Sequence, residues 1–155
     1  MIWLYVAFLA ASILHMMEEY FYPGGFMEVM RDLNPRIAPF VTVPAAVVIN
    51  GLQLLLCILV IAIGMNSVIF SMSLAGLLFI NGLTHVGACI RLHGYAPGVI
   101  TGVLLYLPLT TYAYRFFISS GELTVRGAIL AGVLGLLYQA VPVSYFTLAS
   151  AVRRT

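Results

Sequence analysis

Long apolar stretches dominate the chain, and short polar segments separate them. The first stretch covers residues 2–19, and it is long enough to cross a bilayer if the tyrosines that follow it lie in the interface. A second region runs from Ile37 to Ile90 without a Lys, Arg, Asp or Glu, which is too long for one span. The turn-forming sequence Gly64-Met65-Asn66-Ser67 divides it and predicts helices over 43–63 and 68–91.

The C-terminal half of the sequence predicts two further spans, over residues 97–118 and 124–151. We expect a kink inside each span, at Pro108 and at Pro142. The pattern therefore predicts an all-α protein, a polytopic membrane helix bundle of five transmembrane helices, with residues 1–155 forming a single transmembrane domain.

The segment after the first helix has a different periodicity. We expect Pro23-Gly24-Gly25 to end that helix. Apolar residues then recur at helical spacing from Phe26 to Leu33, and the charged residues of the segment lie on the other side. This pattern predicts a short interfacial amphipathic helix over 25–34, which could act as a lid over a site at this end of the bundle. An irregular loop is the alternative.

Composition supports a membrane protein and excludes one class of partner. Hydrophobic residues make up 63% of the chain and charged residues 8%, whereas soluble domains contain about 25% charged residues. The lipid bilayer is therefore the expected environment. The net charge of +2 is small and scattered, so we expect no nucleic acid partner. Cys57 and Cys89 lack the spacing of a metal knuckle or a disulfide framework.

The arginines predict the orientation. Five spans place the first loop, the turn near residues 91–96 and the C-terminus on one side of the membrane. That side carries five arginines, and the other side carries two: Arg31, Arg36, Arg91, Arg153 and Arg154 against Arg115 and Arg126. By the positive-inside rule, the N-terminus lies outside and the C-terminus is cytoplasmic. The expected location is the bacterial inner (cytoplasmic) membrane.

Unusual polar side chains gather at the predicted cytoplasmic helix ends. His15, Glu18 and Glu19 close the first helix, and His15 shares a helix face with both carboxylates. Asn81, His85 and Cys89 form one stripe on the third helix, and His93 and Tyr95 follow in the turn. Ionisable residues in membrane spans are costly and usually face a partner or a functional cavity. We therefore predict a site that His15 and His85 share.

Three motifs carry a family resemblance: His15-x-x-Glu18-Glu19, Asn81-x-x-x-His85 and Tyr95-x-Pro97-Gly98-x-x-Thr101. In this order, and at membrane-helix ends, they resemble the three signatures of the HXXEE domain family of small bacterial integral membrane proteins. The resemblance covers nearly the whole chain. The family is defined by its motifs and not by a reaction, so the resemblance implies where the site lies and leaves its chemistry open.

The residues favour a metal-dependent membrane enzyme with a hydrolytic or oxidative reaction on an amphipathic or lipid substrate. His15, His85 and either Glu18 or Glu19 would bind a divalent transition metal, because two His and one carboxylate suit zinc or iron. The second Glu would act as general base, and Asn81 or Tyr95 would orient a ligand. His93 is a candidate fourth ligand.

Two other functions use the same residues. In the first, a buried Glu and a His move a proton without a metal, as in an isomerase or hydratase of a lipid-like substrate. In the second, the cluster is a relay in a carrier for protons, metal or a small solute. A carrier needs a polar path to the opposite side, and the polar residues stop about halfway.

Overall fold

The computed structural model describes residues 1–22 and 25–152, and this part is helical with no β-strand. The long helices are α1 (Ile2–Phe21), α3 (Val43–Ile63), α4 (Val68–Leu92), α6 (Leu107–Ser119) and α7 (Val125–Val152). The shorter elements are α2 (Gly25–Leu33), η1 (Ala38–Phe40), η2 (Gly64–Asn66), α5 (Val99–Thr101) and η3 (Gly102–Tyr106). The predicted all-α fold class is confirmed.

Four helices of the described part are long and apolar enough to cross a membrane: Ile2–Phe21, Val43–Asn66, Val68–Leu92 and Val125–Ala151. The remaining predicted span, over residues 97–118, is present as α5, η3 and α6, which follow one another without a gap. Large apolar side chains on the outer faces of α3 and α7 are exposed, including Val47, Val48, Leu52, Leu136 and Leu137. Such extended apolar surfaces indicate membrane insertion.

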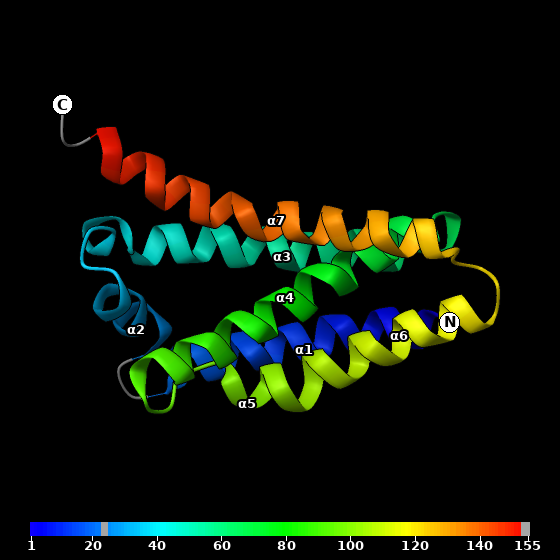
Figure 1. Ribbon diagram of the computed structural model, residues 1–155, viewed down its shortest axis with the longest axis horizontal. Helices are drawn as coiled ribbons and strands as arrows, with labels where there is room; N and C mark the ends of the chain where they lie inside the picture. The colour runs from blue at the N-terminus through cyan, green and yellow to red at the C-terminus, as the bar shows by residue number, and fades with distance from the viewer. Residues whose placement is uncertain (23–24, 153–155) are drawn as a thin grey trace.

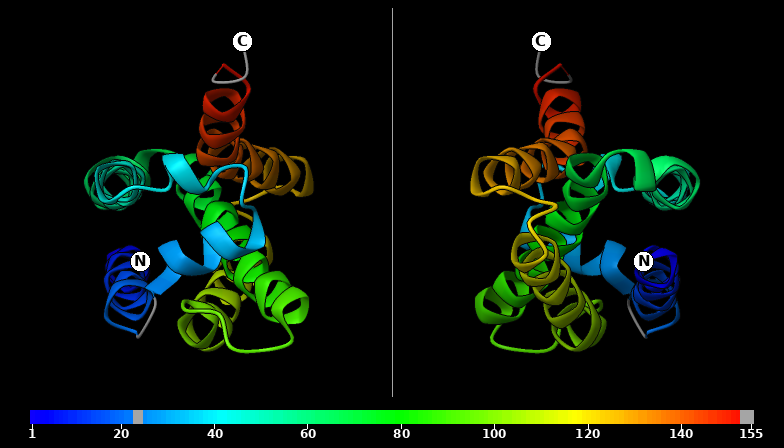
Figure 2. Two further views of the ribbon diagram at one scale, coloured as in Figure 1. Left: turned by 90° about the vertical axis from the view of Figure 1, so that its left-hand side faces the viewer. Right: turned by 90° about the vertical axis from the view of Figure 1, so that its right-hand side faces the viewer.

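The helices form two layers with α4 between them. In Figure 1, α3 and α7 lie on one side, α1 and α6 lie on the other, and α4 runs diagonally across the interior. The end-on views of Figure 2 show the same central position. The last turns of α1, α4 and α7 lie at one end of the bundle, with α2 and the start of α5 (Figure 1).

Glycines set the position of α4 at two close crossings. A Cβ on Gly135 of α7 would lie 2.5 Å from the backbone carbon of Gly76, so only glycine permits this contact. A Cβ on Gly82 would lie 3.2 Å from the carbonyl oxygen of Gly102. Small residues allow membrane helices to approach this closely. The Gly82–Gly102 crossing holds α4 against the helix that begins at Val99. Gly82 lies three residues before His85, so the crossing is close to this histidine.

The two prolines have different effects. Pro108 lies in the first turn of α6, directly after η3, which is a π-helix and not the simple kink we predicted. Because Pro108 has no N–H, the carbonyl one turn earlier has no α-helical partner, and a π segment is a common way to accommodate that loss. Pro142 lies inside α7, and the C-terminal part of that helix bends away from the bundle in Figure 1.

The predicted amphipathic helix is present as α2, and neighbouring segments hold its C-terminal end. Arg31 Nη2 donates to the carbonyl of Val41 at 2.6 Å, and Arg91 Nη2 at the end of α4 donates to the carbonyl of Leu33 at 3.3 Å. The helix therefore lies against the end of the bundle. The predicted stop at Pro23-Gly24 and the C-terminal pair Arg153 and Arg154 lie outside the described residues.

Candidate metal centre

His15, Glu19 and His85 form a buried cluster between α1 and α4. Glu19 lies one turn after His15, so both side chains leave the same face of α1. Glu19 Oε1 lies 3.2 Å from His85 Nε2 and 3.5 Å from His15 Nε2. One ligand atom from each residue lies within 4.8 Å of the others. The side chains of His15, His85 and Glu19 are only 2%, 1% and 7% exposed.

A chain of hydrogen bonds determines the tautomer of His15. Thr101 Oγ1 lies 2.6 Å from Glu18 Oε2 and 2.8 Å from His15 Nδ1. A hydroxyl has one proton, and the carboxylate can only accept, so Thr101 donates to Glu18 and His15 Nδ1–H donates to Thr101. We assign the tautomer from this network. In the neutral imidazole, His15 Nε2 is then an acceptor directed at Glu19.

That nitrogen has no hydrogen-bond partner among the described residues. A buried acceptor without a partner costs free energy, and here it faces an acceptor carboxylate. A cation placed between Nε2 of His15 and the Glu19 carboxylate satisfies both groups. His85 Nδ1 and Asn81 Oδ1 are also buried without a partner within the described ranges. Two imidazoles and one carboxylate are a donor set that zinc and iron(II) use, so the residues fit such an ion.

Glu18 has a different environment from Glu19. Its carboxylate accepts four hydrogen bonds, from Tyr95 Oη at 2.6 Å, Ile100 N at 3.0 Å, Thr101 N at 2.8 Å and Thr101 Oγ1 at 2.6 Å. Two of these donors are free N–H groups in the first turn of α5, where a carboxylate is favourable. The structure therefore brings Glu19 to the histidines and places Glu18 against residues 95–101.

Tyr95 contacts Glu18 and does not reach the cluster directly. Partial burial and the negative charge of the hydrogen-bonded Glu18 raise the pKa of the Tyr95 hydroxyl. The hydroxyl therefore remains a proton donor at neutral pH. The neighbouring Cys89 Sγ accepts a hydrogen bond from Ala96 N at 3.1 Å, which ties the turn to the end of α4.

Gly98 places the backbone directly over the two imidazoles. Its φ is +95°, a left-handed conformation that favours glycine. A Cβ here would lie 2.5 Å from Nδ1 and Cε1 of His85 and 2.9 Å from Cε1 of His15. The conformation and the contact both require glycine. Gly98 belongs to the third motif of the sequence, and its backbone is part of the wall of the cluster.

Aromatic rings complete the enclosure. The Tyr106 ring lies 4.5 Å from the His15 ring, and the Phe26 ring of α2 lies 4.9 Å from the His85 ring. Tyr106 is fully buried, and its hydroxyl accepts a hydrogen bond from Gln53 Nε2 at 3.0 Å. Gln53 Nε2 also lies 3.3 Å from Ser12 Oγ. The sequence analysis missed this network, although a glutamine in the middle of the apolar helix 43–63 was a signal.

Of the other predicted site residues, Asn81 lies near the cluster and His93 does not. Asn81 is one turn before His85 on α4, with its unpartnered Oδ1 buried. His93 is exposed and ends α4 in a left-handed conformation, with φ of 52°, so the structure does not bring it to the other ligands. Asn50 Nδ2 donates to Tyr20 Oη at 3.0 Å.

A comparison with known families identifies the chain. Residues 6–113 match the family described as "Protein of unknown function with HXXEE motif". The chain belongs to the HXXEE family. The matched range contains every residue of the cluster and the 95–101 segment that contacts it. No curated protein and no solved structure matches the chain. In this HXXEE protein, the His and the second Glu of the motif form the cluster, and the first Glu binds residues 95–101.

Proposed function

We propose that this HXXEE protein is an integral-membrane metalloenzyme that acts on an amphipathic or lipid substrate. His15, Glu19 and His85 would bind one zinc or iron(II) ion. The observation that carries the proposal is the environment of His15: one ring nitrogen donates to Thr101, and the other is buried, has no hydrogen-bond partner among the described residues and is directed at a carboxylate. Metal-binding histidines are usually held in this way through the nitrogen that does not bind the metal.

The residues around the centre have separable roles. A bound ion would act as a Lewis acid on a carbonyl oxygen or on water, with coordination positions left over by three protein ligands. Asn81 Oδ1 would accept a hydrogen bond from a molecule bound near His85. Glu18 is occupied by four donors, so it acts as a positioning residue through Thr101 and not as a general base.

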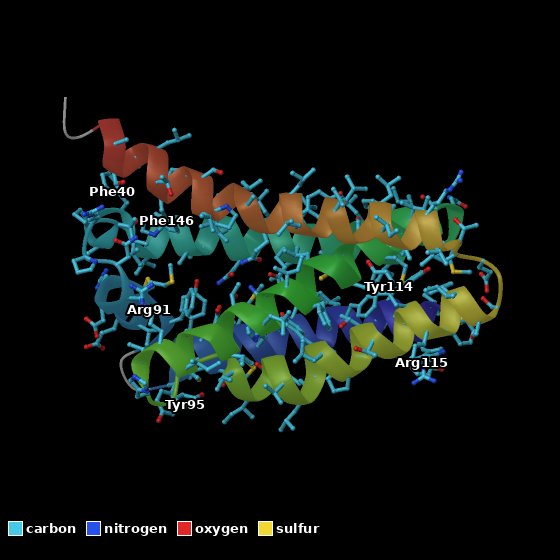
Figure 3. The ribbon with its side chains drawn as sticks, in the orientation of Figure 1. Phe40, Arg91, Tyr95, Tyr114, Arg115 and Phe146 are labelled. Carbon is cyan, nitrogen blue, oxygen red and sulfur yellow. The ribbon has the colours of Figure 1, made fainter. Side chains whose placement is uncertain are left out.

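The proposed orientation follows from the two ends of the bundle. Arg91 lies at the end that holds the cluster and α2, and Arg115 lies at the opposite end (Figure 3). Arg31 and Arg36 also precede α3 at the cluster end, which supports a cytoplasmic position for that end and an external N-terminus. In a bacterium, the protein would then lie in the inner membrane with the centre near the cytoplasmic surface.

A metal-free acid–base enzyme is the second candidate. It is favoured by the distance of 3.2 Å between His85 Nε2 and Glu19 Oε1, across which a proton can move. The carrier hypothesis has less support. Farther along the bundle, the buried hydroxyls of Ser71, Ser73 and Thr110 donate to backbone carbonyls, so they offer no relay of free donors and acceptors.

Metal analysis of the protein purified in detergent without chelators tests the proposal. We expect near-stoichiometric zinc or iron in the wild type, and its loss in His15→Ala, His85→Ala and Glu19→Gln. His93→Ala and Cys57→Ser are the matched controls and should retain the metal. Wild-type protein that binds neither ion after reloading would refute the metal centre and favour the acid–base enzyme.

A further inference from the structure

We propose that the apolar cavity beside the His15–Glu19–His85 cluster binds the tail of a single-chain amphiphile, and that such an amphiphile is the substrate. This inference rests on the proposed function, because it names the molecule that would reach the proposed centre. The cavity has a volume of 270 Å³ and is enclosed by α1, α2, the start of α3 and Phe146 of α7. Figure 3 shows Phe146 at the same end of the bundle as α2.

The cavity and the cluster share part of their walls. Glu19 lines the cavity and contacts both histidines. Phe26 also lines the cavity, and its ring lies 4.9 Å from the His85 ring. A ligand in the cavity therefore lies next to the Glu19 carboxylate and next to the Phe26 ring that contacts His85. A small displacement of α2 would open the way to His85.

The lining matches a molecule with one apolar and one polar part. Most of the surface is hydrocarbon or thioether, from Phe26, Met27, Met30, Val41, Ala46, Ile49 and Phe146. The methionines of α2 are flexible and can adapt to chains of different shape. The polar groups are Glu19, Tyr22, Thr42 and the hydrogen-bonded pair Tyr20–Asn50. An alkyl chain fits the first set, and a polar end fits the second.

The size of the cavity selects among lipids. Pockets that enclose drug-sized ligands usually have volumes of about 300–1,000 Å³, so 270 Å³ is near the lower limit. One alkyl chain of moderate length can enter, whereas the two long chains of a membrane phospholipid cannot. With a divalent ion bound by two neutral imidazoles and one carboxylate, the centre would keep one positive charge. This charge favours a carboxylate or carbonyl oxygen on the polar end.

Photolabelling in lipid nanodiscs tests the inference. The probe is dodecanoic acid with a diazirine in its chain, in nanodiscs of diacyl phosphatidylcholine. We expect saturable labelling of α2, the start of α3 and Phe146, displaced by unlabelled dodecanoate. Ala46→Phe fills the cavity and should lose most of this labelling. Val47→Phe adds the same ring to an exposed neighbouring position and should retain it.

A second variant covers the case in which Ala46→Phe does not fold, as judged by size-exclusion chromatography. Met30→Ala enlarges the cavity, and displacement should then favour hexadecanoate over dodecanoate relative to the wild type. Labelling that does not saturate, or equal labelling of the same residues by a diazirine-bearing diacyl phosphatidylcholine, would overturn the inference.

Metal content measured on the same samples separates this inference from the proposed function. Bound metal with unsaturable labelling would refute the amphiphile alone. Saturable cavity labelling in a protein that never binds metal would refute the metalloenzyme and support the tail site. Ala46→Phe should keep its metal while it loses the label, because Ala46 does not belong to the cluster.

Discussion

Replacing Glu18 by glutamine tests whether this residue acts on the centre through Thr101. All four partners of Glu18 donate hydrogen bonds to it: Tyr95 Oη, Ile100 N, and the N–H and hydroxyl of Thr101. A glutamine side chain has one acceptor oxygen and one NH₂ group. If the NH₂ group faces Ile100 N, that backbone donor loses its partner. If it faces Thr101, the hydroxyl must accept from it and can then donate to His15.

The second arrangement would reverse the tautomer of His15. Nδ1 would become the acceptor, and the proton would move to Nε2, the nitrogen directed at Glu19. The first arrangement leaves the exposed Ile100 N–H without its partner, and the second leaves the partly buried Thr101 N–H without one, which costs about 1–3 kcal/mol of stability. For the second, changes that disturb the groups behind a metal ligand typically weaken metal binding by about 10–100-fold. We therefore expect Glu18→Gln to weaken zinc binding about 10–100-fold and to leave the fold intact.

Competition with a chromophoric zinc chelator measures the affinity, and thermal unfolding in detergent measures the stability. Thr101→Val should weaken binding by a similar factor, because it removes the acceptor of His15 Nδ1–H, and Thr101→Ser should restore it. Glu28→Gln removes an exposed carboxylate on α2 and is the matched control. Wild-type affinity in Glu18→Gln would refute the positioning role. Complete loss of zinc in Glu18→Gln, but not in Glu19→Gln, would show that Glu18 is the ligand.

Three other predictions follow from the same geometry. Gly98→Ala should lose its metal, because the added Cβ would overlap the His85 ring. The free energy of unfolding should fall by roughly 2–5 kcal/mol, as for severe overpacking. Calorimetry and metal analysis test this. Asn81→Ala should leave the metal bound, as measured by chelator competition, because Asn81 Oδ1 has no partner among the described residues. Reporter fusions should place the N-terminus outside and the C-terminus in the cytoplasm, and two termini on one side would refute this topology. A spin label at Glu28 should change mobility when dodecanoate binds, and unchanged spectra at saturation would leave α2 as a simple anchor.

The sequence pattern predicted the helices well, because apolar length and turn residues determine them locally. It also predicted that His15 and His85 would share a site, since buried ionisable groups in a membrane must face one another or a cavity. It could not choose between Glu18 and Glu19. Both share a helix face with His15, and the choice depends on where residues 95–101 lie, which is a tertiary contact distant in sequence.

Other parts of the site depended on contacts that no local pattern encodes. His93 is close to His85 in sequence, but the left-handed turn at the end of α4 places it in an exposed position. Tyr106 was indistinguishable from an ordinary apolar-face tyrosine until its ring was found on His15. The π-helical segment also required the structure, because a proline in a helix predicts a disturbance without specifying its kind.

That π-helical segment determines which residues can reach His15. Thr101 bonds its Nδ1 and Tyr106 packs on its ring, although the two are five residues apart. At about 100° per residue, an α-helix would place them about 140° apart, on different sides. The i→i+5 bonding of η3 brings them to one side, and the extra residue is accommodated by Val103 and Leu104, which are exposed. In this helix, one residue more than the α-helical repeat requires, placed on the exposed side, allows two side chains to hold the same imidazole.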